Sequence, residues 1–406
     1  MAVAAQGLYK TLAYKKQTGI GVPATGAGSQ YLRRETATFD KTKAAIASNE
    51  IVSHQQYMGD TYGVGQTSGQ LTCTLSAGSF APLLTSLLRG ASTAGVASTG
   101  MSLTIAGTGP TFTLTRAAGS FLADGVKLGD VVQLTAGAFT GNALNINLVI
   151  IALTATVATV IVPNNVTLAA QGPIASSTLT VLNKKVVVPS TGQANDYYTF
   201  EEWFADIARS RVYTDTQVAS CDLKVPANGN CTAQFNFLGL ARTENATQQF
   251  TSPTAASTST IISAENAEII IAGTQYLVGT SIDIKIEGQL KAGDPVVGSK
   301  SINDLIKGDI KVTGSIAVLK QDESLSAFFE NETPVSIIVA LFVDTTNTSQ
   351  FVSFVIPLAK LFKDQTDDGK KQIVNTFDFT AQYNGASGGA GTATDTGILT
   401  MQDSNM

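Results

Sequence analysis

The sequence predicts a mainly β protein with short helices, built as two tandem β-sandwich domains with a small β-barrel or sandwich module inserted into the first. Three observations predict this class. Most segments rich in β-branched residues alternate apolar and polar positions, which is typical of antiparallel sheets with one buried face. One strand–helix unit occurs twice along the chain. A separate run of short strands interrupts its first copy.

The first copy begins with a segment that the sequence marks as a long hairpin. Ile51–Tyr62 is polar and extended, and Gln70–Leu75 alternates as a strand. Three glycines, which we interpret as a break between the two, lie between them: Gly63, Gly65 and Gly69. We expect Ile51–Gln66 to project as an arm.

A short helix over Ser79–Gly90 follows the strand of the first copy. Its apolar residues recur at helical spacing and form one stripe: Phe80, Leu83, Leu84, Leu87 and Leu88. We expect Ser79 to be the N-cap and Gly90 to take the left-handed position after the helix.

The second copy repeats this order later in the chain. Gly308–Val318 is again an alternating strand, and Asp322–Asn331 is again a short helix. Its apolar residues reproduce the spacing of the first helix: Leu325, Phe328 and Phe329. Asn331 stands where Gly90 stood, and Gly293–Gly298 is a second glycine-rich hairpin tip upstream.

The segments downstream of each helix also correspond. We match Tyr197–Ala208 with Phe351–Phe362, and Asn230–Leu238 with Gln372–Thr380, because each pair shares its order and its aromatic alternation. The chain therefore reads as two divergent copies of one β-rich unit of about 150 residues each, the common size of a domain.

Short strands parted by glycine turns fill Leu103–Val181, and a Ser/Thr/Gly/Ala-rich linker precedes them. Insertions that leave their host fold intact enter at surface loops, so this module should project outward. The expected division is residues 1–93 for the first domain with its arm and long hairpin, 94–183 for the inserted module, 184–249 for the rest of the first domain, and 250–406 for the second domain with a C-terminal arm.

The composition argues for self-association and against several other functions. Charged residues make up only 14% of the 406 residues, so little charge must be desolvated at an interface. A net charge of −5 gives no basic footprint for nucleic acid. The longest apolar run, Leu148–Val162, is broken by threonines, and we interpret it as paired strands. We expect neither a secretion signal nor a membrane segment.

The sequence contains few candidates for catalytic or ligand-binding residues. The single histidine, His54, lies in the polar arm and cannot complete a catalytic triad. Gly293–Ser301 has the glycine spacing of a phosphate loop but places Ser where the lysine must be. Three cysteines are expected to be buried and unbonded: Cys73, Cys221 and Cys231. We therefore predict no enzyme, no cofactor and no metal site.

A succession of short motifs resembles the major tail tube proteins of long-tailed, siphovirus-like bacteriophages. The motifs are Leu32-Arg33-Arg34, Lys43, Ser48–Ser53, Gly69-Gln70-Leu71, the helix Ser76–Gly90, Phe200–Trp203, Asn228–Gly239 and the glycine-rich tail. Phe121–Val132 resembles the small β modules inserted in many of these proteins. Val52 departs from the family, which often has arginine there, so a contact made by that arginine is in doubt in this chain.

The resemblance implies a structural virion protein whose sheets join into rings, and whose rings stack into the hollow tail tube for genome delivery. Its implied partners are further copies of itself, the tape measure protein in the lumen, the tail terminator and distal tail proteins, and genomic DNA that passes non-specifically. Assembly is expected in the host bacterial cytoplasm, with no membrane contact. The alternative is a β-modular adhesin or decoration protein of the virion surface.

The resemblance also implies that hairpins and terminal arms bridge successive rings. We expect these residues to make the contact between rings: Ile51, Val52, Tyr57, Tyr62, Gly63, Gly65, Val296 and Val297. Tubes of this family present six sandwich domains around each ring. If each copy of the unit supplies one domain, three chains form a pseudo-hexameric ring, and the size of about 150 residues for each copy favours this arrangement. The alternative is a homohexamer, which is needed if the copies are halves of one sheet system.

Overall fold

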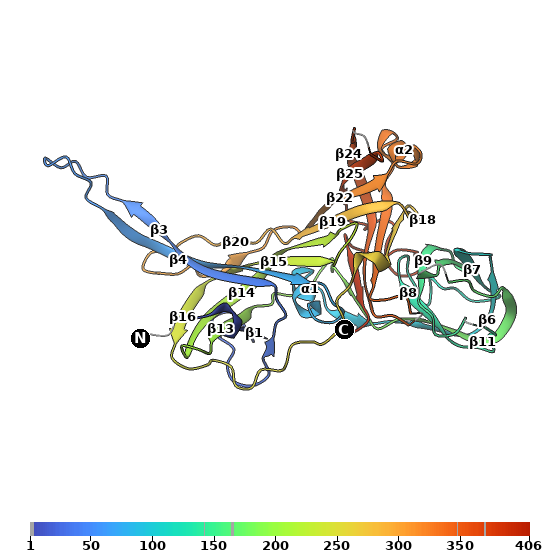
Figure 1. Ribbon diagram of the computed structural model, residues 1–406, viewed down its shortest axis with the longest axis horizontal. Coiled ribbons are helices and arrows are strands. Elements are labelled where there is room, and N and C mark those ends of the chain that lie inside the picture. The colour runs from blue at the N-terminus through green and yellow to red at the C-terminus, as the bar shows by residue number, and fades with distance from the viewer. Residues whose placement is uncertain (1–3, 142, 164–165, 347, 369–370) are drawn as a thin grey trace.

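The computed structural model of the chain describes residues 4–406 except 142, 164–165, 347 and 369–370. It confirms the mainly β class: long antiparallel strands and a closed barrel dominate, and the described residues include two short α-helices. The molecule is elongated, with a two-stranded arm at one end, the barrel at the other, and the large sheets between them (Figure 1).

Eight strands form one continuous antiparallel sheet, which we call the main sheet. In spatial order they are β3 (Thr36–Ala47), β4 (Asp60–Thr74), β15 (Thr232–Gly239), β14 (Arg209–Val225), β19 (Gly279–Glu287), β22 (Lys311–Leu319), β25 (Val374–Ala381) and β24 (Phe351–Thr366). The first four belong to the first copy of the unit and the last four to the second. The copies meet where β14 pairs with β19.

The two halves of the main sheet match strand for strand. Gly69 of β4 lies between Phe39 and Phe237 on the neighbouring strands, and a Cβ at Gly69 would lie 2.3 Å from the Phe39 ring. Gly314 of β22 lies beside Phe379 in the same way, and a Cβ at Gly314 would lie 2.5 Å from the Phe379 ring. Each half therefore keeps one glycine so that an aromatic ring can lie across the strand.

One predicted correspondence is confirmed and one is wrong. β15 and β25 occupy equivalent places, as expected. Tyr197–Ala208, however, forms β13 (Tyr198–Phe204), which pairs with β14. In the second copy, β23 (Val335–Phe342) pairs with β24 in the same way. The counterpart of β13 is therefore β23, and the counterpart of β24 is β14. The prediction failed because consecutive strands in each copy share the same aromatic alternation.

A second sheet packs behind each half of the main sheet, since β14 and β24 are long and bend from one layer into the other. The first copy orders its second sheet as β2 (Gln30–Tyr31), β1 (Lys10–Lys16), β13, β14 and β16 (Ala241–Asn245). The second copy orders its own as β18 (Thr274–Gln275), β17 (Ala267–Ile271), β23, β24, β26 (Thr400–Asp403), β12 (Lys184–Val187) and β5 (Ser92–Ala94). Tyr14, Phe39, Phe200 and Phe237 pack between the layers of the first copy.

Both helices form where predicted but end differently. α1 is Ala81–Leu87 and α2 is Ser324–Glu330. Ser79 is not the N-cap, because its hydroxyl hydrogen-bonds to the hydroxyl of Ser76 at 2.6 Å. Gly90 is not the left-handed residue, because Arg89 has the positive φ, at 54°. Gly90 instead permits a close approach, since a Cβ there would lie 2.5 Å from the Val187 carbonyl oxygen.

The end of the second helix is shifted in the opposite direction. Asn331 keeps a negative φ of −88°, and Glu332 has a φ of 51°. The described residues also include the short 3₁₀ helices η1 (Gly7–Tyr9) and η3 (Ala264–Asn266).

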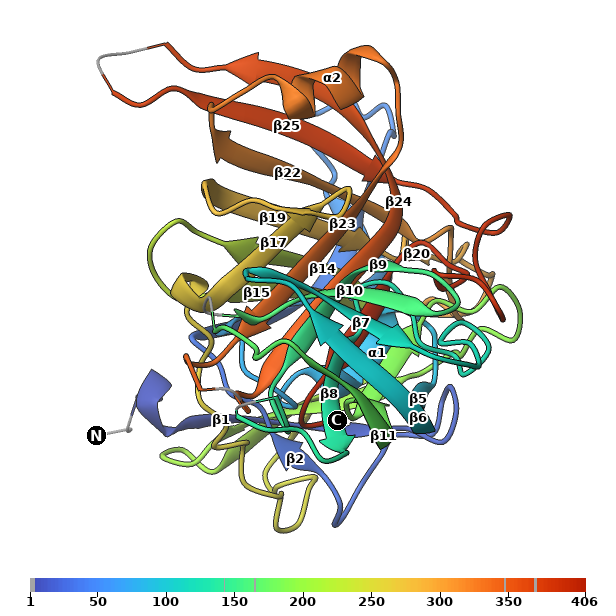
Figure 2. The same cartoon turned by 90° about the vertical axis from the view of Figure 1, so that its right-hand side faces the viewer.

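The inserted module is a closed six-stranded barrel with its own apolar core. Its strands are β6 (Ala97–Ala106), β7 (Thr111–Arg116), β8 (Val131–Ala136), β9 (Leu148–Leu153), β10 (Val157–Ile161) and β11 (Gln171–Val181). The apolar run over Leu148–Val162 is the paired strands β9 and β10, as predicted. No helix in the described part of the chain is long and apolar enough to cross a membrane. Figures 1 and 2 place the barrel against the second copy, beside β23 and β24.

The three cysteines are buried and free, as predicted: Cys73, Cys221 and Cys231. Burial raises the pKa of Cys231 to about 12, so its thiol stays protonated at neutral pH.

Candidate assembly surfaces

The arm is a continuation of β3 and β4 beyond the main sheet (Figure 1). The two strands stay paired from Lys43 and Gly65 out to Ala47 and Asp60, and the connecting tip is residues 48–59. A projecting hairpin is therefore present, as predicted, but its first strand is β3, and Ile51 lies in the connecting tip rather than at the start of the arm. The predicted break at the glycines is wrong, because all three lie inside β4. A Cβ on Gly63 would lie 3.0 Å from the Cβ of Ala44, so this glycine allows close cross-strand packing.

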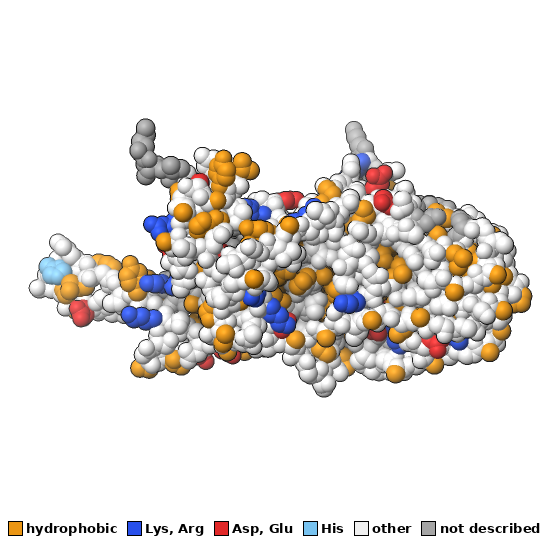
Figure 3. Space-filling view, turned by 90° about the horizontal axis from the view of Figure 1, so that it is seen from below, with side chains coloured by type: hydrophobic (Ala, Val, Ile, Leu, Met, Phe, Trp, Pro, Cys, Tyr) orange, Lys and Arg blue, Asp and Glu red, His pale blue; other side chains and the backbone are white. Residues whose placement is uncertain are grey.

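Large apolar side chains are exposed along this arm. Ile51 and Tyr62 are almost fully exposed, at 102% and 86%, Tyr57 is exposed at 64%, and Val52 is half-buried. In the space-filling view, hydrophobic side chains gather along the arm and the single histidine lies at its far end (Figure 3). Exposed apolar groups on a projecting element indicate a surface for another protein.

The second copy carries a shorter projection at the equivalent place, between β19 and β22. It contains the two-residue strands β20 (Lys291–Ala292) and β21 (Leu305–Ile306), which pair with each other. Val297 at its tip is fully exposed, and Val296 is exposed at 46%. The projection runs beside the base of the arm, where Gly65 donates a backbone hydrogen bond to the Lys300 carbonyl at 3.3 Å. Gly65 is therefore buried by its own chain, unlike the exposed residues of the predicted contact set.

The main sheet has two edges without a strand partner among the described residues. One is the outer edge of β3, where Lys41 and Lys43 are exposed. The other is the end of β24, over residues 363–366, which pairs only with β25. An unpaired edge of this kind is a template for pairing with another chain.

Arg89 joins the two copies at the internal junction. Its guanidinium donates to the carbonyls of Gly288 at 2.6 Å and Gly308 at 2.8 Å, and to the side chain of Gln193 at 3.1 Å. Burial lowers the pKa of Arg89, and nearby Asp309 opposes this shift. Arg89, which follows the C-cap residue of α1, thus holds both ends of the projection that links β19 to β22.

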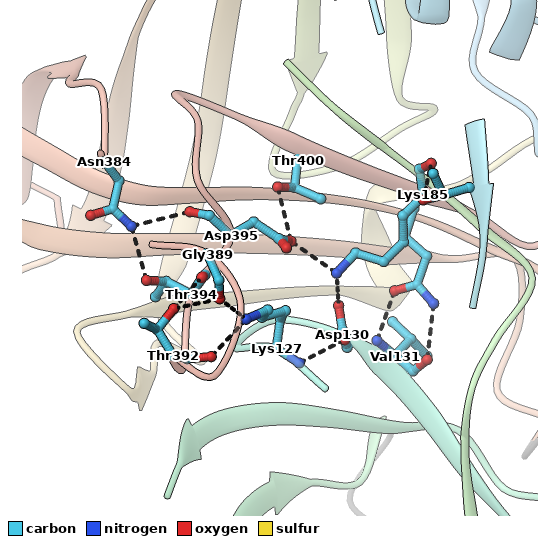
Figure 4. A network of polar contacts seen from close by, with 12 residues as sticks. Lys127, Asp130, Val131, Lys185, Asn384, Gly389, Thr392, Thr394, Asp395 and Thr400 are labelled. Carbon is cyan, nitrogen blue, oxygen red and sulfur yellow. Dashed lines mark hydrogen bonds and ion pairs between the residues drawn. The ribbon is translucent and has the colours of Figure 1, made fainter. Parts of the chain in front are cut away.

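A buried ionic clamp holds the barrel against the C-terminal segment (Figure 4). The Nζ of Lys185 lies 2.5 Å from Oδ1 of Asp130 and 2.9 Å from Oδ2 of Asp395. Burial lowers the pKa of Lys185, but these two carboxylates outweigh it and hold that pKa above its usual value. Lys127 donates to the backbone carbonyls of Gly389 and Thr392.

An apolar interface lies beside this clamp. The barrel contributes Val131, Val149, Ile151 and Ile161, and the second copy contributes Ile270, Ile338, Ala340, Phe342, Phe351 and Val355. The side-chain amide of Gln402 adds a hydrogen bond to the Val131 carbonyl at 2.9 Å. The barrel therefore packs directly on the second copy through an apolar interface and the clamp.

The chain was also compared with models of known protein families. A family model described as phage tail tube protein matches residues 8–381, which is most of the chain. The chain belongs to the phage tail tube protein family. A search among curated proteins found no match. As a tail tube family member the chain is a structural component of the phage virion.

The predicted metal and catalytic residues can be compared with the described part of the chain. No group of His, Cys, Asp and Glu in the described ranges could hold a metal ion. His54 is exposed at the arm tip, and its Nδ1 accepts a hydrogen bond from the Gln56 backbone at 3.2 Å.

Sequence reasoning missed the clamp and the role of Arg89. From the sequence, no role was assigned to Asp130 or to Lys185. A signal was present, because both are charged residues next to apolar strands. Lys185 and Asp130, however, are 55 residues apart in the sequence, so their pairing depends on the tertiary fold.

Replacing Arg89 with alanine should loosen the internal junction of this tail tube protein. The change leaves the carbonyls of Gly288 and Gly308 without their charged donor, so we expect the free energy of unfolding to fall by about 2–4 kcal/mol. Denaturant titration measures the effect, with Arg209→Ala at an exposed position of β14 as the control. An unchanged midpoint in both variants would show that Arg89 does not hold the junction.

Proposed function

We propose that this protein assembles into stacked rings that form the tube of a long, siphovirus-like tail, through which the genome is delivered. The observation that carries the proposal is the main sheet. It already joins two copies of one unit edge to edge, and it leaves one free edge on each copy. Repeating this edge-to-edge contact between chains is a head-to-tail interface, which generates a closed ring when its rotation closes.

We favour three chains in each ring. Three chains with eight main-sheet strands each supply 24 strands, and strands about 4.8 Å apart would close into a barrel of roughly 18–24 Å backbone radius, depending on tilt. Six chains would double the number of strands and about double this radius. A homohexamer is thus the alternative, and it requires a much wider tube.

The open face of the main sheet suits a lumen through which DNA slides. The second sheets pack on its other face, so the open face is the one left to line the ring. It carries five carboxylates (Asp40, Asp222, Asp283, Glu287 and Asp378) and five lysines (Lys224, Lys285, Lys311, Lys360 and Lys363) among hydroxyl and amide side chains. The charges balance, and Lys285 is paired with Glu287 at 2.6 Å. A surface without net charge exerts little pull on phosphates.

The remaining partners are those that the likeness to tail tube proteins implies. The arm and the projection at Val296 and Val297 would contact the next ring, and the tape measure protein would fill the lumen before DNA enters. Tail terminator and distal tail proteins would cover the two end rings. Assembly would take place in the host bacterial cytoplasm.

We also propose the division into residues 1–93 with 184–249, 250–406, and the inserted module 94–183. The separate core of the barrel supports it, although β5 and β12, which flank the barrel, pair within the second copy's sheet. The outward position of the barrel is supported by its place behind the main sheet (Figure 2).

The isolated segment 96–182 should fold on its own, because its core is built from its own strands. We expect a single cooperative thermal transition by circular dichroism; a broad, non-cooperative melt would contradict this. The full chain without the module should still form rings, provided that the uncovered interface is made polar by Ile338→Thr and Phe351→Thr. Loss of rings in that variant, with its fold intact, would show that the module takes part in assembly.

Electron microscopy of the purified chain tests the proposed function. Rings or tubes with threefold symmetry are the expected result. Six whole chains in one ring would overturn the stoichiometry. Monomers or compact trimers without a central channel would overturn the tube and favour the alternative, an adhesin or decoration protein of the virion surface.

A further inference from the structure

The internal junction between β14 and β19 offers a template for the junction between chains. β14 carries a bulge between Val218 and Ser220, which lie opposite Phe237 and Asn236 of β15. β24 carries a bulge at the same place, since Leu361 and Lys363 lie opposite Phe379 and Asp378 of β25. The two strands are therefore equivalent residue by residue here, and Asp364 of β24 corresponds to Cys221 of β14.

The same comparison aligns the opposite edges. Lys41 of β3 pairs with Thr67, two residues before Gly69, and Ile286 of β19 pairs with Val312, two residues before Gly314. Lys41 therefore corresponds to Ile286. Inside the chain, Ile286 lies directly opposite Cys221. By the same register, Lys41 of one chain comes to lie opposite Asp364 of the next.

We propose that β3 of one copy pairs antiparallel with the end of β24 of a second copy, in the register that places Lys41 opposite Asp364. This inference rests on the proposed ring and specifies its contact. Opposite charges at directly facing positions favour this register over a slip by one residue, which would turn each side chain to the other face of the sheet.

The free state of the β24 edge supports this pairing. Oδ1 of Asp364 is shielded from solvent yet accepts no hydrogen bond from any described residue. The nearby Lys320 is already paired with Glu323 at 2.8 Å. A buried carboxylate oxygen without a donor is costly, and a lysine from a second chain would supply one.

The bulge itself points to the same partner. At the internal junction the bulged Ala219 accepts a hydrogen bond from the Gly288 backbone at 2.8 Å. The equivalent residues at the open edges are Phe362 and Lys43. The side chain of Phe362 is 62% exposed on the free edge, and a neighbouring β3 would cover it.

The helix ends supply a second complementary pair. Arg89 follows α1 with a left-handed φ and reaches the Gly288 carbonyl across the internal junction. Glu332 follows α2 with the same backbone conformation, and the residue that corresponds to Gly288 is Lys43. The edge of the second copy thus presents Glu332 and Asp364, and the edge of the first presents Lys43 and Lys41.

Paired cysteines test the register in the assembled protein. Directly opposed residues have Cβ atoms about 4.5–5.5 Å apart, so Lys41→Cys with Asp364→Cys should cross-link on mild oxidation. The two positions lie at opposite edges of an eight-stranded sheet, so no bond forms within one chain. We expect a non-reducing gel to show a ladder that ends at three chains. The register control, Lys41→Cys with Lys363→Cys, should not cross-link, because Lys363 faces the other side.

Charge reversal at Lys41 and Asp364 provides a second, independent test of the pairing. Lys41→Glu or Asp364→Lys alone should reduce the assembled fraction at least about tenfold, and the two changes in one chain should restore it. A mixture of the two single variants cannot close a three-chain ring without one repelling junction, whereas a six-chain ring could alternate them. Wild-type yield from the mixture would therefore overturn the three-chain ring but keep the pairing.

The outcomes separate this inference from the proposed function. Rings that form in the microscope without the Lys41–Asp364 cross-link would overturn the register and leave the ring intact. A wild-type chain that forms no rings would overturn both.

Discussion

A chain in which Ala45–Tyr62 is replaced by an Asn-Gly turn should fold normally and form no tubes. The strand pairings and hydrogen bonds of the replaced residues are made within the hairpin, and none of these residues belongs to a described apolar core. We expect the free energy of unfolding to change by less than about 1 kcal/mol. Single rings should persist, because the edges of the main sheet are untouched. Electron microscopy and sedimentation measure the loss of stacking.

Point substitutions supply the matched control for the arm. Ile51→Ser with Tyr57→Ser keeps the arm at full length and removes its exposed apolar groups, and it should also weaken stacking. Leu277→Ser removes another exposed apolar side chain, 70% accessible, from a different surface and should not weaken stacking. Tubes at normal yield from the shortened chain would show that the arm does not connect rings.

Replacing Lys185 with methionine should be the most damaging single change at the barrel. Asp130 is 2% exposed and would keep a buried charge without its cation, which costs about 3–5 kcal/mol when one partner of a buried pair is removed. Hydrogen exchange should then rise first around Lys127–Val131 and Gly389–Asp395, where the clamp joins barrel and C-terminal loop.

The neighbouring residue offers a close control for this prediction. Lys184→Met changes an exposed lysine on the same strand and should leave stability within about 0.5 kcal/mol. Adding Asp130→Asn to Lys185→Met should recover part of the loss, because it removes the unpaired charge. Equal stability of Lys184→Met and Lys185→Met would contradict the clamp.

The clamp also has a pH dependence of defined sign. The pKa of Lys185 lies above 10.5 in the folded protein, because Asp130 and Asp395 outweigh the effect of burial. Its stabilisation is therefore present at neutral pH and is lost as the pH rises above 10.5 through the folded-state value. Lys185→Met should abolish the part of the alkaline destabilisation that comes from this residue.

Local patterns were enough to predict the class, the duplication and the long hairpin. Alternation with period two requires only that one face of each strand be buried. The apolar stripe from Phe80 to Leu88 requires only that residues three and four apart lie on the same face of a helix. Helix ends were less predictable. We predicted Gly90 as the left-handed residue. In the structure Gly90 allows the close approach of the Val187 backbone, and Arg89 has the left-handed backbone conformation.

The sequence by itself determined that this protein is two copies of a β unit with a third module, since repetition and periodicity are properties of neighbouring residues. Only the tertiary structure decided how the pieces join: β14 against β19, Lys185 between Asp130 and Asp395, and two edges left open. The reason is that backbone hydrogen bonds at a strand edge are the same for every sequence. The choice of partner therefore depends on the packing of the whole chain, which places the edges and the buried charges next to each other.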